Sequence, residues 1–324
     1  MALLELTEKG IYCPQAKVYI DPQKPVHRAL ITHGHADHVR WGSKNYLCTH
    51  KAKPVIQYRL GNSPRIESVP YGEVLSIHGV KVSFHPAGHI LGSAQIRLEY
   101  GGEVWVVSGD YKTEDDGICT AFEPVRCNVF ITECTFGLPI FRWKPQKEVM
   151  TEINNWWRSN AKEGKVSILM VYALGKAQRV LKYLDTRIGP VFSHGSVESI
   201  NKIFKSQGVE LPSAPRASVK NLQGQMEGSL VLAPRSALRP SWVRRFKDYT
   251  TGVASGWLCI PDAPHHKFAD QGFILSDHAD WDGLHETVKA TGAEKVYTMH
   301  GYTREFAQSL TEKGIWAEEL KTKH

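Results

Sequence analysis

The chain has 324 residues, 42% of them hydrophobic, which favours two domains, or one domain with a large insertion, around a substantial core. Its formal net charge of +7 favours polyanionic partners, but many basic enzymes do not bind nucleic acid, so charge alone does not identify a partner. No apolar run approaches the roughly 18–20 residues of a membrane span, and no signal-peptide pattern opens the sequence. We therefore expect a soluble cytoplasmic protein without a membrane partner, with its six scattered cysteines reduced.

Short strands separated by turns are predicted for the first part of the chain. They cover residues 18–21, 29–32, 81–84, 95–100, 104–107 and 129–132. Gly, Pro or Asp punctuates most of their ends, as expected for turns. This part is therefore predicted to be rich in β-structure.

After about Pro139, strands alternate with helices. Helices are predicted at residues 146–164, 175–188, 198–207, 281–291 and 304–313. Strands are predicted at residues 166–171, 191–193, 273–275 and 295–298, and a polar surface loop at 212–228. Alternation of this kind predicts a small parallel α/β unit.

A histidine-rich motif, His33-Gly-His-Ala-Asp-His38, follows the predicted strand at residues 29–32. Imidazole nitrogen and carboxylate oxygen bind borderline divalent metals at roughly 2.0–2.2 Å. Side chains two apart in a loop leaving a strand can point the same way, so His33 and His35 can share one ion. Asp37 and His38 then face a neighbouring position. A surface histidine cluster fits the intact pattern less well.

One loop cannot complete a two-metal site, and three later residues are candidates for the missing ligands. His89 lies in a Gly-rich turn between two predicted strands, Asp110 ends a strand, and His300 follows the predicted strand at 295–298. Each alone would more often be an ordinary loop residue. Together they predict a metal centre at strand ends.

These motifs, together with Asp21, resemble the successive motifs of the metallo-β-lactamase superfamily. Residues 131–137 (Ile-Thr-Glu-Cys-Thr-Phe-Gly) resemble the E-x-T-[FY]-G motif of the β-CASP nucleases, and residues 275–280 (Leu-Ser-Asp-His-Ala-Asp) resemble their S-x-H-[AST]-[DS] motif. Residues 173–178 resemble the segment that opens the inserted domain, and His300 matches the third β-CASP motif. The resemblance covers nearly the whole chain. It is nearest to the bacterial ligase-associated DNA exonucleases, which are similar to mRNA 3′-end processing nucleases.

The resemblance implies an α/β fold. Residues 1–140 and 270–324 would form a metallo-β-lactamase αββα sandwich, and residues 141–269 a β-CASP-like inserted domain. It also implies two divalent metal ions, zinc being favoured and manganese an alternative. The implied ligands of the first ion are His33, His35, His89 and Asp110. The implied ligands of the second ion are Asp37, His38, Asp110 and His300.

The resemblance also implies roles in a phosphodiesterase reaction with metal-bound hydroxide as nucleophile, at a site in which Asp37 is counted as catalytic. His278 would be the general acid, since imidazole titrates near neutral pH. Glu133 would orient His278 and favour its protonated form. Asp21 would hydrogen-bond a ligand imidazole from behind. The plain alternatives are a strand-end acid for Glu133 and a turn residue for Asp21.

Contacts to substrate are predicted in the inserted domain, at Arg235, Ser236, Trp257 and Lys176. Residues 250–257 resemble an element of the DNA-repair branch, whereas His300 favours the RNA-processing branch. Residues 239–247 place basic side chains beside aromatic ones, which suits single strands. A surface helix whose aromatic side chains Trp242 and Phe246 face the core fits that segment slightly better.

A DNA exonuclease in DNA repair is the favoured function, with nucleic acid as partner and, by family resemblance, a DNA ligase and helicase. An RNA-processing endo- or exoribonuclease of the same fold is the nearest alternative. A lactonase, thioesterase or glyoxalase-like hydrolase would not need the Glu133 and His278 motifs or the insertion. A scaffold with a degenerate site is disfavoured because every expected ligand is present.

Overall fold

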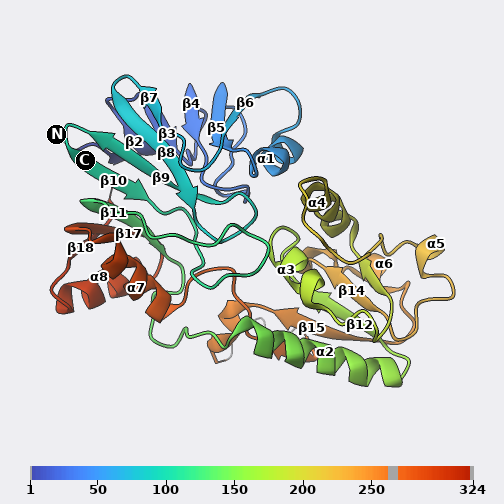
Figure 1. Ribbon diagram of the computed structural model, residues 1–324. Coiled ribbons are helices and arrows are strands. Elements are labelled where there is room, and N and C mark those ends of the chain that lie inside the picture. The colour runs from blue at the N-terminus through green and yellow to red at the C-terminus, as the bar shows by residue number, and fades with distance from the viewer. Residues whose placement is uncertain (1, 262–268, 322–324) are drawn as a thin grey trace. The chain divides into compact units, whose positions relative to one another are not determined.

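The computed structural model describes residues 2–261 and 269–321 (Figure 1). By internal contacts the chain divides into two compact units. One comprises Met1–Arg142 with His278–His324, and the other comprises Trp143–Asp277. Helices and strands occur in both, so the predicted α/β class is confirmed. Across the described residues, no helix has the length and apolar character to cross a membrane.

The first unit contains a six-stranded sheet in the order β1-β2-β3-β4-β5-β6. Its strands are β1 (Glu5–Thr7), β2 (Gly10–Cys13), β3 (Val18–Ile20), β4 (Arg28–Leu30), β5 (Asn45–Thr49) and β6 (Arg65–Val69). The pairs from β1 to β3 are antiparallel, and those from β3 to β6 are parallel. The carboxyl ends of β3 and β4 therefore meet at one edge.

A seven-stranded sheet, ordered β18-β17-β11-β10-β9-β8-β7, completes the strands of this unit. Its strands are β7 (Leu75–Ile77), β8 (Val80–Pro86), β9 (Ala94–Tyr100), β10 (Glu103–Val107), β11 (Val129–Cys134), β17 (Lys295–Gly301) and β18 (Trp316–Glu319). The pairing from β10 through β11 and β17 to β18 is parallel. Segments far apart in the chain, residues 75–134 and 295–319, thus share one sheet.

Four layers make up the first unit: helix, sheet, sheet, helix. The inner faces of the two sheets share one core, to which Ile20 contributes from β3 and Ile131 from β11. Helix α1 (Lys53–Leu60) covers the outer face of the six-stranded sheet. Helices α7 (Trp281–Thr291) and α8 (Thr303–Glu312) cover the outer face of the seven-stranded sheet. Each fully buried Leu, Ile or Phe side chain contributes about 1.5–3 kcal/mol to this packing.

The second unit is built on a five-stranded parallel sheet, ordered β13-β14-β12-β15-β16. Its strands are β12 (Val166–Met170), β13 (Val191–Ser193), β14 (Leu230–Ala233), β15 (Tyr249–Ala254) and β16 (Gln271–Phe273). Its helices are α2 (Gln146–Lys162), α3 (Lys176–Tyr183), α4 (Gly195–Ser206), α5 (Val219–Leu222) and α6 (Pro240–Val243). Separate apolar clusters cover the two faces of the sheet, which explains why strands such as β12 and β14 are buried throughout and largely apolar.

Three sequence predictions for this unit need correction. Helix α3 ends at Tyr183 rather than 188, because Leu184 adopts an extended backbone. The segment at 212–228 is not only a polar loop, because it contains α5 and the fully buried Leu222. The expected domain boundary at residue 270 also shifts. Strand β16 pairs with β15, so residues 271–273 fold with the second unit and not with the first.

Candidate metal centre

The histidine motif forms a tight turn directly after β4. The backbone N–H groups of His38 and Val39 both donate to the carbonyl of His35, at 3.2 and 3.0 Å. His33 and His38 are buried, His35 is half-buried, and the Asp37 side chain is exposed. The turn therefore presents its four polar side chains toward one end of the sheets.

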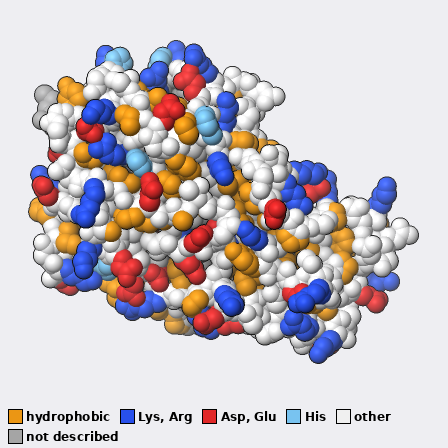
Figure 2. Space-filling view, viewed as in Figure 1, with side chains coloured by type: hydrophobic (Ala, Val, Ile, Leu, Met, Phe, Trp, Pro, Cys, Tyr) orange, Lys and Arg blue, Asp and Glu red, His pale blue; other side chains and the backbone are white. Residues whose placement is uncertain are grey.

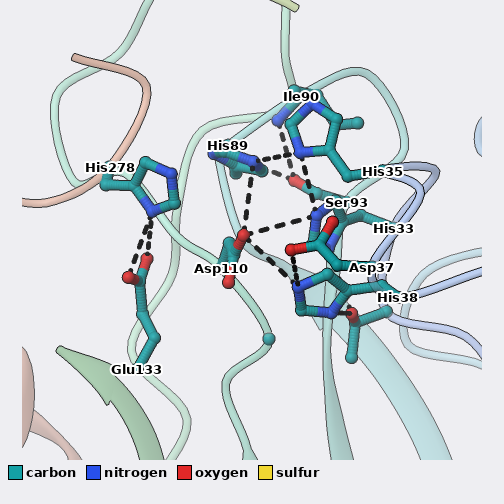
Figure 3. A network of polar contacts seen from close by, with 12 residues as sticks. His33, His35, Asp37, His38, His89, Ile90, Ser93, Asp110, Glu133 and His278 are labelled. Atoms are coloured by element: carbon teal, nitrogen blue, oxygen red, sulfur yellow. Dashed lines mark hydrogen bonds and ion pairs between the residues drawn. The ribbon is translucent and has the colours of Figure 1, made fainter. Parts of the chain in front are cut away.

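Three imidazoles and one carboxylate converge at this end (Figure 3). His35 Nδ1 lies 3.1 Å from His33 Nε2 and 3.0 Å from His89 Nε2. Asp110 Oδ2 lies 3.5 Å from His33 Nε2 and 3.7 Å from His89 Nε2. A tetrahedral ion with ligands at about 2.0–2.1 Å requires ligand atoms roughly 3.3 Å apart. These separations bracket that value, so the residues present fit a divalent cation.

Asp110 also contacts a second group of side chains. Its Oδ2 lies 3.5 Å from His38 Nε2, and His38 Nε2 lies 3.7 Å from Asp37 Oδ2. The ring of His300 is centred 5.6 Å from the ring of His38. One carboxylate oxygen thus touches both predicted ligand sets, the geometry expected of a bridging ligand. Binding of a second ion by this set stays a prediction.

Asp21 orients the His38 ring from behind. Its carboxylate accepts hydrogen bonds from the N–H and Oγ1 of Thr32, at 2.9 and 2.5 Å, and lies 2.7 Å from His38 Nδ1. The Nε2 edge of His38 consequently faces Asp110. Thr32 Oγ1 also lies 3.1 Å from His33 Nδ1. Sequence reasoning missed Thr32, although its place directly before the motif was a usable signal.

The electrostatics of the cluster favour a cation. Burial holds the pKa of His33 well below its usual value, which keeps the ring in the neutral form that metals require. Burial opposes charge on His38 too, but Asp110 and Asp21 outweigh it and hold that pKa well above its usual value. Burial would raise the pKa of Asp110, yet His38 and His33 hold it well below, so Asp110 is ionised.

Glu133 and His278 form a second polar group beside the cluster. Glu133 lies near the end of β11 with 1% of its surface exposed, and its two oxygens lie 2.8 and 3.1 Å from His278 Nδ1. The same carboxylate accepts from the Tyr111 N–H at 2.9 Å and from Thr135 Oγ1 at 2.5 Å. Asp110, Glu133 and His278 each offer a ligand atom within 4.8 Å of the other two.

Two residues of the site have left-handed backbone, which L-residues rarely adopt. Asp21 has φ of 43° and His300 has φ of 57°. In the β11–β17 ladder, Glu133 pairs with Met299 and Cys134 pairs with Gly301. His300 is therefore the extra residue of a β-bulge. Bulges redirect side chains, often next to functional sites, and no sequence signal predicted this one.

A cavity of about 430 Å³ adjoins the second ligand set. Its lining includes Asp21, Asp37, His38 and His300, and the remainder is a mixture of apolar residues such as Ile20 and Met299 with polar ones such as Thr298, Glu319 and Lys321. The predicted second metal position therefore borders an open space rather than a packed core.

The four predicted substrate contacts all lie in the second unit. Arg235 and Ser236 are exposed in a 3-10 turn (Arg235–Ala237) that follows β14, and Trp257 is half-buried in another (Gly256–Cys259). Lys176 differs, because only 4% of it is exposed and its Nζ lies 3.4 Å from Asp277 Oδ2. Its charge serves an internal ion pair, so it is not retained as a substrate contact.

No family model matches the chain. A probable DNA ligase of Opitutus terrae is 31% identical over 313 residues, which are 95% of this chain and 30% of that protein. Endoribonuclease YSH1 of Gibberella zeae is 31% identical over 51% of this chain and 19% of its own length. The YSH1 of Saccharomyces cerevisiae is 32% identical over 37% of this chain and 16% of its own length. This chain thus spans less than a third of these relatives.

A solved structure shares the fold. It is a protein of unknown function from Enterococcus faecalis V583, with a TM-score of 0.64 and 10% identity over 91% of this chain and 79% of that one. The fold and the named relatives together fit the metal-dependent nucleases of the metallo-β-lactamase superfamily. The relationship to the β-CASP nucleases within it, predicted from the motifs, is confirmed at this level.

Proposed function

We propose that this protein is a metal-dependent phosphodiesterase that cleaves nucleic acid. The observation that carries the proposal is the position of Asp110, which joins the imidazole cluster to the Glu133–His278 pair. The proposed architecture is a metallo-β-lactamase αββα sandwich with a β-CASP-type insertion. We place the return to the sandwich at His278 rather than residue 270, since β16 pairs with β15.

Two divalent ions, zinc or manganese, would bind the scissile phosphate and lower the pKa of a water toward about 7. The proposed ligands are those predicted from the sequence: His33, His35, His89 and Asp110 for one ion, and Asp37, His38, Asp110 and His300 for the other. The side chain of Asp37 is exposed, and it would also line the space that the attacking water enters.

His278 is the proposed proton donor to the departing oxygen. Glu133 fixes the Nδ1 edge of its ring, so the Nε2 edge is the one directed away from the carboxylate. An imidazole held beside a carboxylate in this way retains a proton that it can give to a leaving group. Phe136 and His89 confine the ring, with centroid distances of 5.7 and 4.6 Å.

DNA is the proposed substrate, and exonucleolytic DNA repair the proposed role. Support comes from the probable DNA ligase, in which the region similar to 95% of this chain makes up under a third of the length. A DNA ligase is thus a proposed partner, and a helicase is a further one from family resemblance. Arg235, Ser236 and Trp257 are the proposed strand contacts. Six free cysteines support a reducing, cytoplasmic location.

RNA cleavage is the second candidate. Seven of the relatives are endoribonucleases named YSH1, from different fungi and 31–34% identical over parts of this chain. Incubating the purified protein with end-labelled single-stranded DNA and RNA, with zinc or manganese supplied, separates the two substrates. A ladder of shortened products indicates exonuclease action. If neither the DNA nor the RNA is cleaved, the proposal is contradicted.

Replacing the proposed acid tests the assignment directly. We expect His278→Ala to lower the turnover of the preferred strand by about 10²–10⁴-fold, because the leaving oxygen loses its proton donor. Metal content, measured by mass spectrometry, should stay at the wild-type level. The matched control is His50→Ala, which removes an exposed histidine bonded to Ser68. Wild-type turnover by His278→Ala would remove the general-acid role.

A further inference from the structure

A cationic cluster lies at the carboxyl edge of the second unit's parallel sheet, where β13 ends and α4 begins. The backbone of Arg216 bridges to Ser193, the last residue of β13. This places its guanidinium over Gly195, where a Cβ would lie 3.3 Å from Nε and 3.4 Å from Cζ of Arg216. A glycine at this position therefore leaves room for the arginine.

Arg245 joins the cluster from the segment after α6. Its Nη1 donates to the carbonyl of Ala217 at 2.7 Å, and its Nε donates to the carbonyl of Trp242 at 2.8 Å. Its guanidinium carbon lies 5.4 Å from the centre of the Trp242 ring, within the range of a cation–π contact. Backbone acceptors and an aromatic face hold Arg245 without neutralising it.

His194 connects the two arginines. Its ring is centred 5.6 Å from the Trp242 ring, and its Nδ1 accepts from the N–H of Ser196 at 3.2 Å. Burial, followed by the charges of Arg216 and Arg245, lowers the pKa of His194. The charged side chains that act on this ring are thus both cations.

Charge compensation distinguishes this cluster from other cations of the unit. Arg158 and Arg187 contact Asp185, and Lys202 contacts Glu198. Within residues 2–261 and 269–321, neither Arg216 nor Arg245 lies within ion-pair distance of an acidic group. The cluster therefore carries a positive potential that an anion would compensate. Figure 2 shows basic and acidic side chains interspersed over the face in view.

We propose that Arg216, Arg245 and His194 bind a phosphodiester of a single nucleic-acid strand, outside the metal centre. The identification of the anion rests on the proposed function. Guanidinium groups present planar donors that match phosphate oxygens. The half-buried Trp242 beside them offers a ring edge for a base, as sites for single strands do. The cluster brings together residues up to 51 positions apart in sequence (194 to 245), so it was not apparent as a motif.

The site is tested by strand binding to the full-length, zinc-loaded protein. Fluorescence anisotropy of a labelled single-stranded oligonucleotide with cleavage-resistant phosphorothioate linkages gives affinity over a series of salt concentrations. We expect Arg216→Gln to weaken binding about 3- to 10-fold and to lower the salt slope by about 0.7–1. Arg216 is exposed, so this substitution should leave the fold intact, and circular dichroism checks that it does.

The matched control is Arg187→Gln, in which an 89% exposed arginine already paired with Asp185 is replaced. It should bind like the wild type. Equal affinity and equal salt slope for Arg216→Gln and the wild type would overturn the proposed site. Failure of the proposed function would give a different result. The wild-type protein would then cleave neither DNA nor RNA, while Arg216→Gln would still bind the strand more weakly than the wild type.

Discussion

Two carboxylates, the buried Glu133 and the half-buried Asp21, control the direction of the imidazoles in the first unit. Asp21 accepts two hydrogen bonds from Thr32 and contacts His38, and Glu133 accepts from Tyr111 and Thr135 and contacts His278. Because each carboxylate has several partners, it has little freedom to rotate. The rings that it contacts are held in one orientation before any substrate arrives, which is how supporting hydrogen bonds preorganise a site.

His285, on the outer helix α7, gives the first unit a pH-dependent stability. Burial, with the charge of Lys313, lowers the pKa of His285 to about 4. Between about pH 6.5 and pH 4, His285 is protonated in the unfolded chain but neutral in the folded protein. Stability therefore falls as pH falls through this window. Because the ring is half exposed, we expect a loss of only about 1 kcal/mol.

Urea unfolding at pH 7.5 and pH 5 measures this loss, with His285→Gln as the comparison. The other histidines are common to both proteins and cancel in the difference. The wild type should lose more stability than His285→Gln between the two pH values. An identical pH dependence of the two proteins would show that the environment of His285 does not oppose its charge.

At the scale of single residues, much of the candidate metal centre could be predicted, including the supporting carboxylates Asp21 and Glu133. The groups that in turn hold those two carboxylates could not. A ligand motif is local in sequence, so His33 to His38 are recognisable directly. Thr32 and Tyr111 act through an ordinary hydroxyl and a backbone N–H, which leave no distinctive pattern. Thr135 lay inside a recognised motif, but its contact to Glu133 needed the folded turn.

Strand β17 and the turn after it depend on a glycine. Gly301 has φ of 80°, and a Cβ there would lie 2.4 Å from both the carbonyl oxygen of Cys134 and the Cα of Thr135. We expect Gly301→Ala to destabilise the protein by about 2–4 kcal/mol, since backbone must move in addition to the conformational strain. Urea unfolding measures the change.

Gly314 is the matched position for that experiment. It has φ of 82°, and a Cβ added there would meet no neighbouring group within 4 Å. Gly314→Ala should therefore cost only the conformational term of about 1–2 kcal/mol. If the two variants lose the same stability, the close packing around Gly301 is not what requires a glycine.

Helix α3 is tied to the end of the second unit by a buried ion cluster. Arg179, 1% exposed, has Nη2 2.7 Å from Asp277 Oδ1 and donates from Nη1 to the carbonyl of Ser276 at 2.6 Å. Removing one partner of a buried pair typically costs about 3–5 kcal/mol, because the other charge stays buried. We expect Arg179→Ala to lose about 3 kcal/mol, since Lys176 partly compensates Asp277.

Thermal and urea unfolding of Arg179→Ala and Arg187→Ala separate this effect from the loss of any arginine. Arg187 also pairs with an aspartate, but its side chain is 89% exposed. Exposed pairs contribute about 0–1 kcal/mol, so Arg187→Ala should change stability little. Similar losses for both variants would contradict a special role for the buried cluster.

Elements with clear caps and periodicity were predictable, and elements stabilised by distant packing were not. Helix α7 matches its predicted bounds, because Asp280 caps its start and Gly292 ends it in left-handed backbone. Helix α1 was not predicted, because its eight residues have no side-chain cap at the N-terminus and little amphipathic pattern. The short β1 and β7 depend on neighbouring strands for their conformation.

For the molecule as a whole, both possible metal-binding groups among the described residues lie in the first unit. Ions that bind only folded protein stabilise it by about 2.7 kcal/mol when present at 100 times their Kd. We therefore expect zinc to raise, and chelation to lower, the unfolding temperature of the first unit alone. Calorimetry should show one metal-sensitive and one metal-insensitive transition, and equal shifts of both would contradict this assignment.

The order of the strands in the sheets shows why local sequence patterns cannot predict the whole fold. Strand β11 pairs with β17, although Val129 and its partner Lys295 are far apart in sequence. Alternating elements indicated an α/β protein with an insertion, but pairings across such distances depend on the complete set of strands. The resemblance to a known family supplied this long-range information, and the amino-acid pattern alone did not.

The bulge in β17 makes one position sensitive to chain length as well as to residue type. His300 points where it does because the strand contains one residue more than its partner pairs with. A deletion of one residue among 295–299 would carry the imidazole to the face occupied by Met299, which is partly buried against the core between the sheets. Every motif would still be readable in such a sequence. We therefore expect that an insertion or deletion in this strand can displace the proposed ligand His300 in a relative whose motifs are all intact.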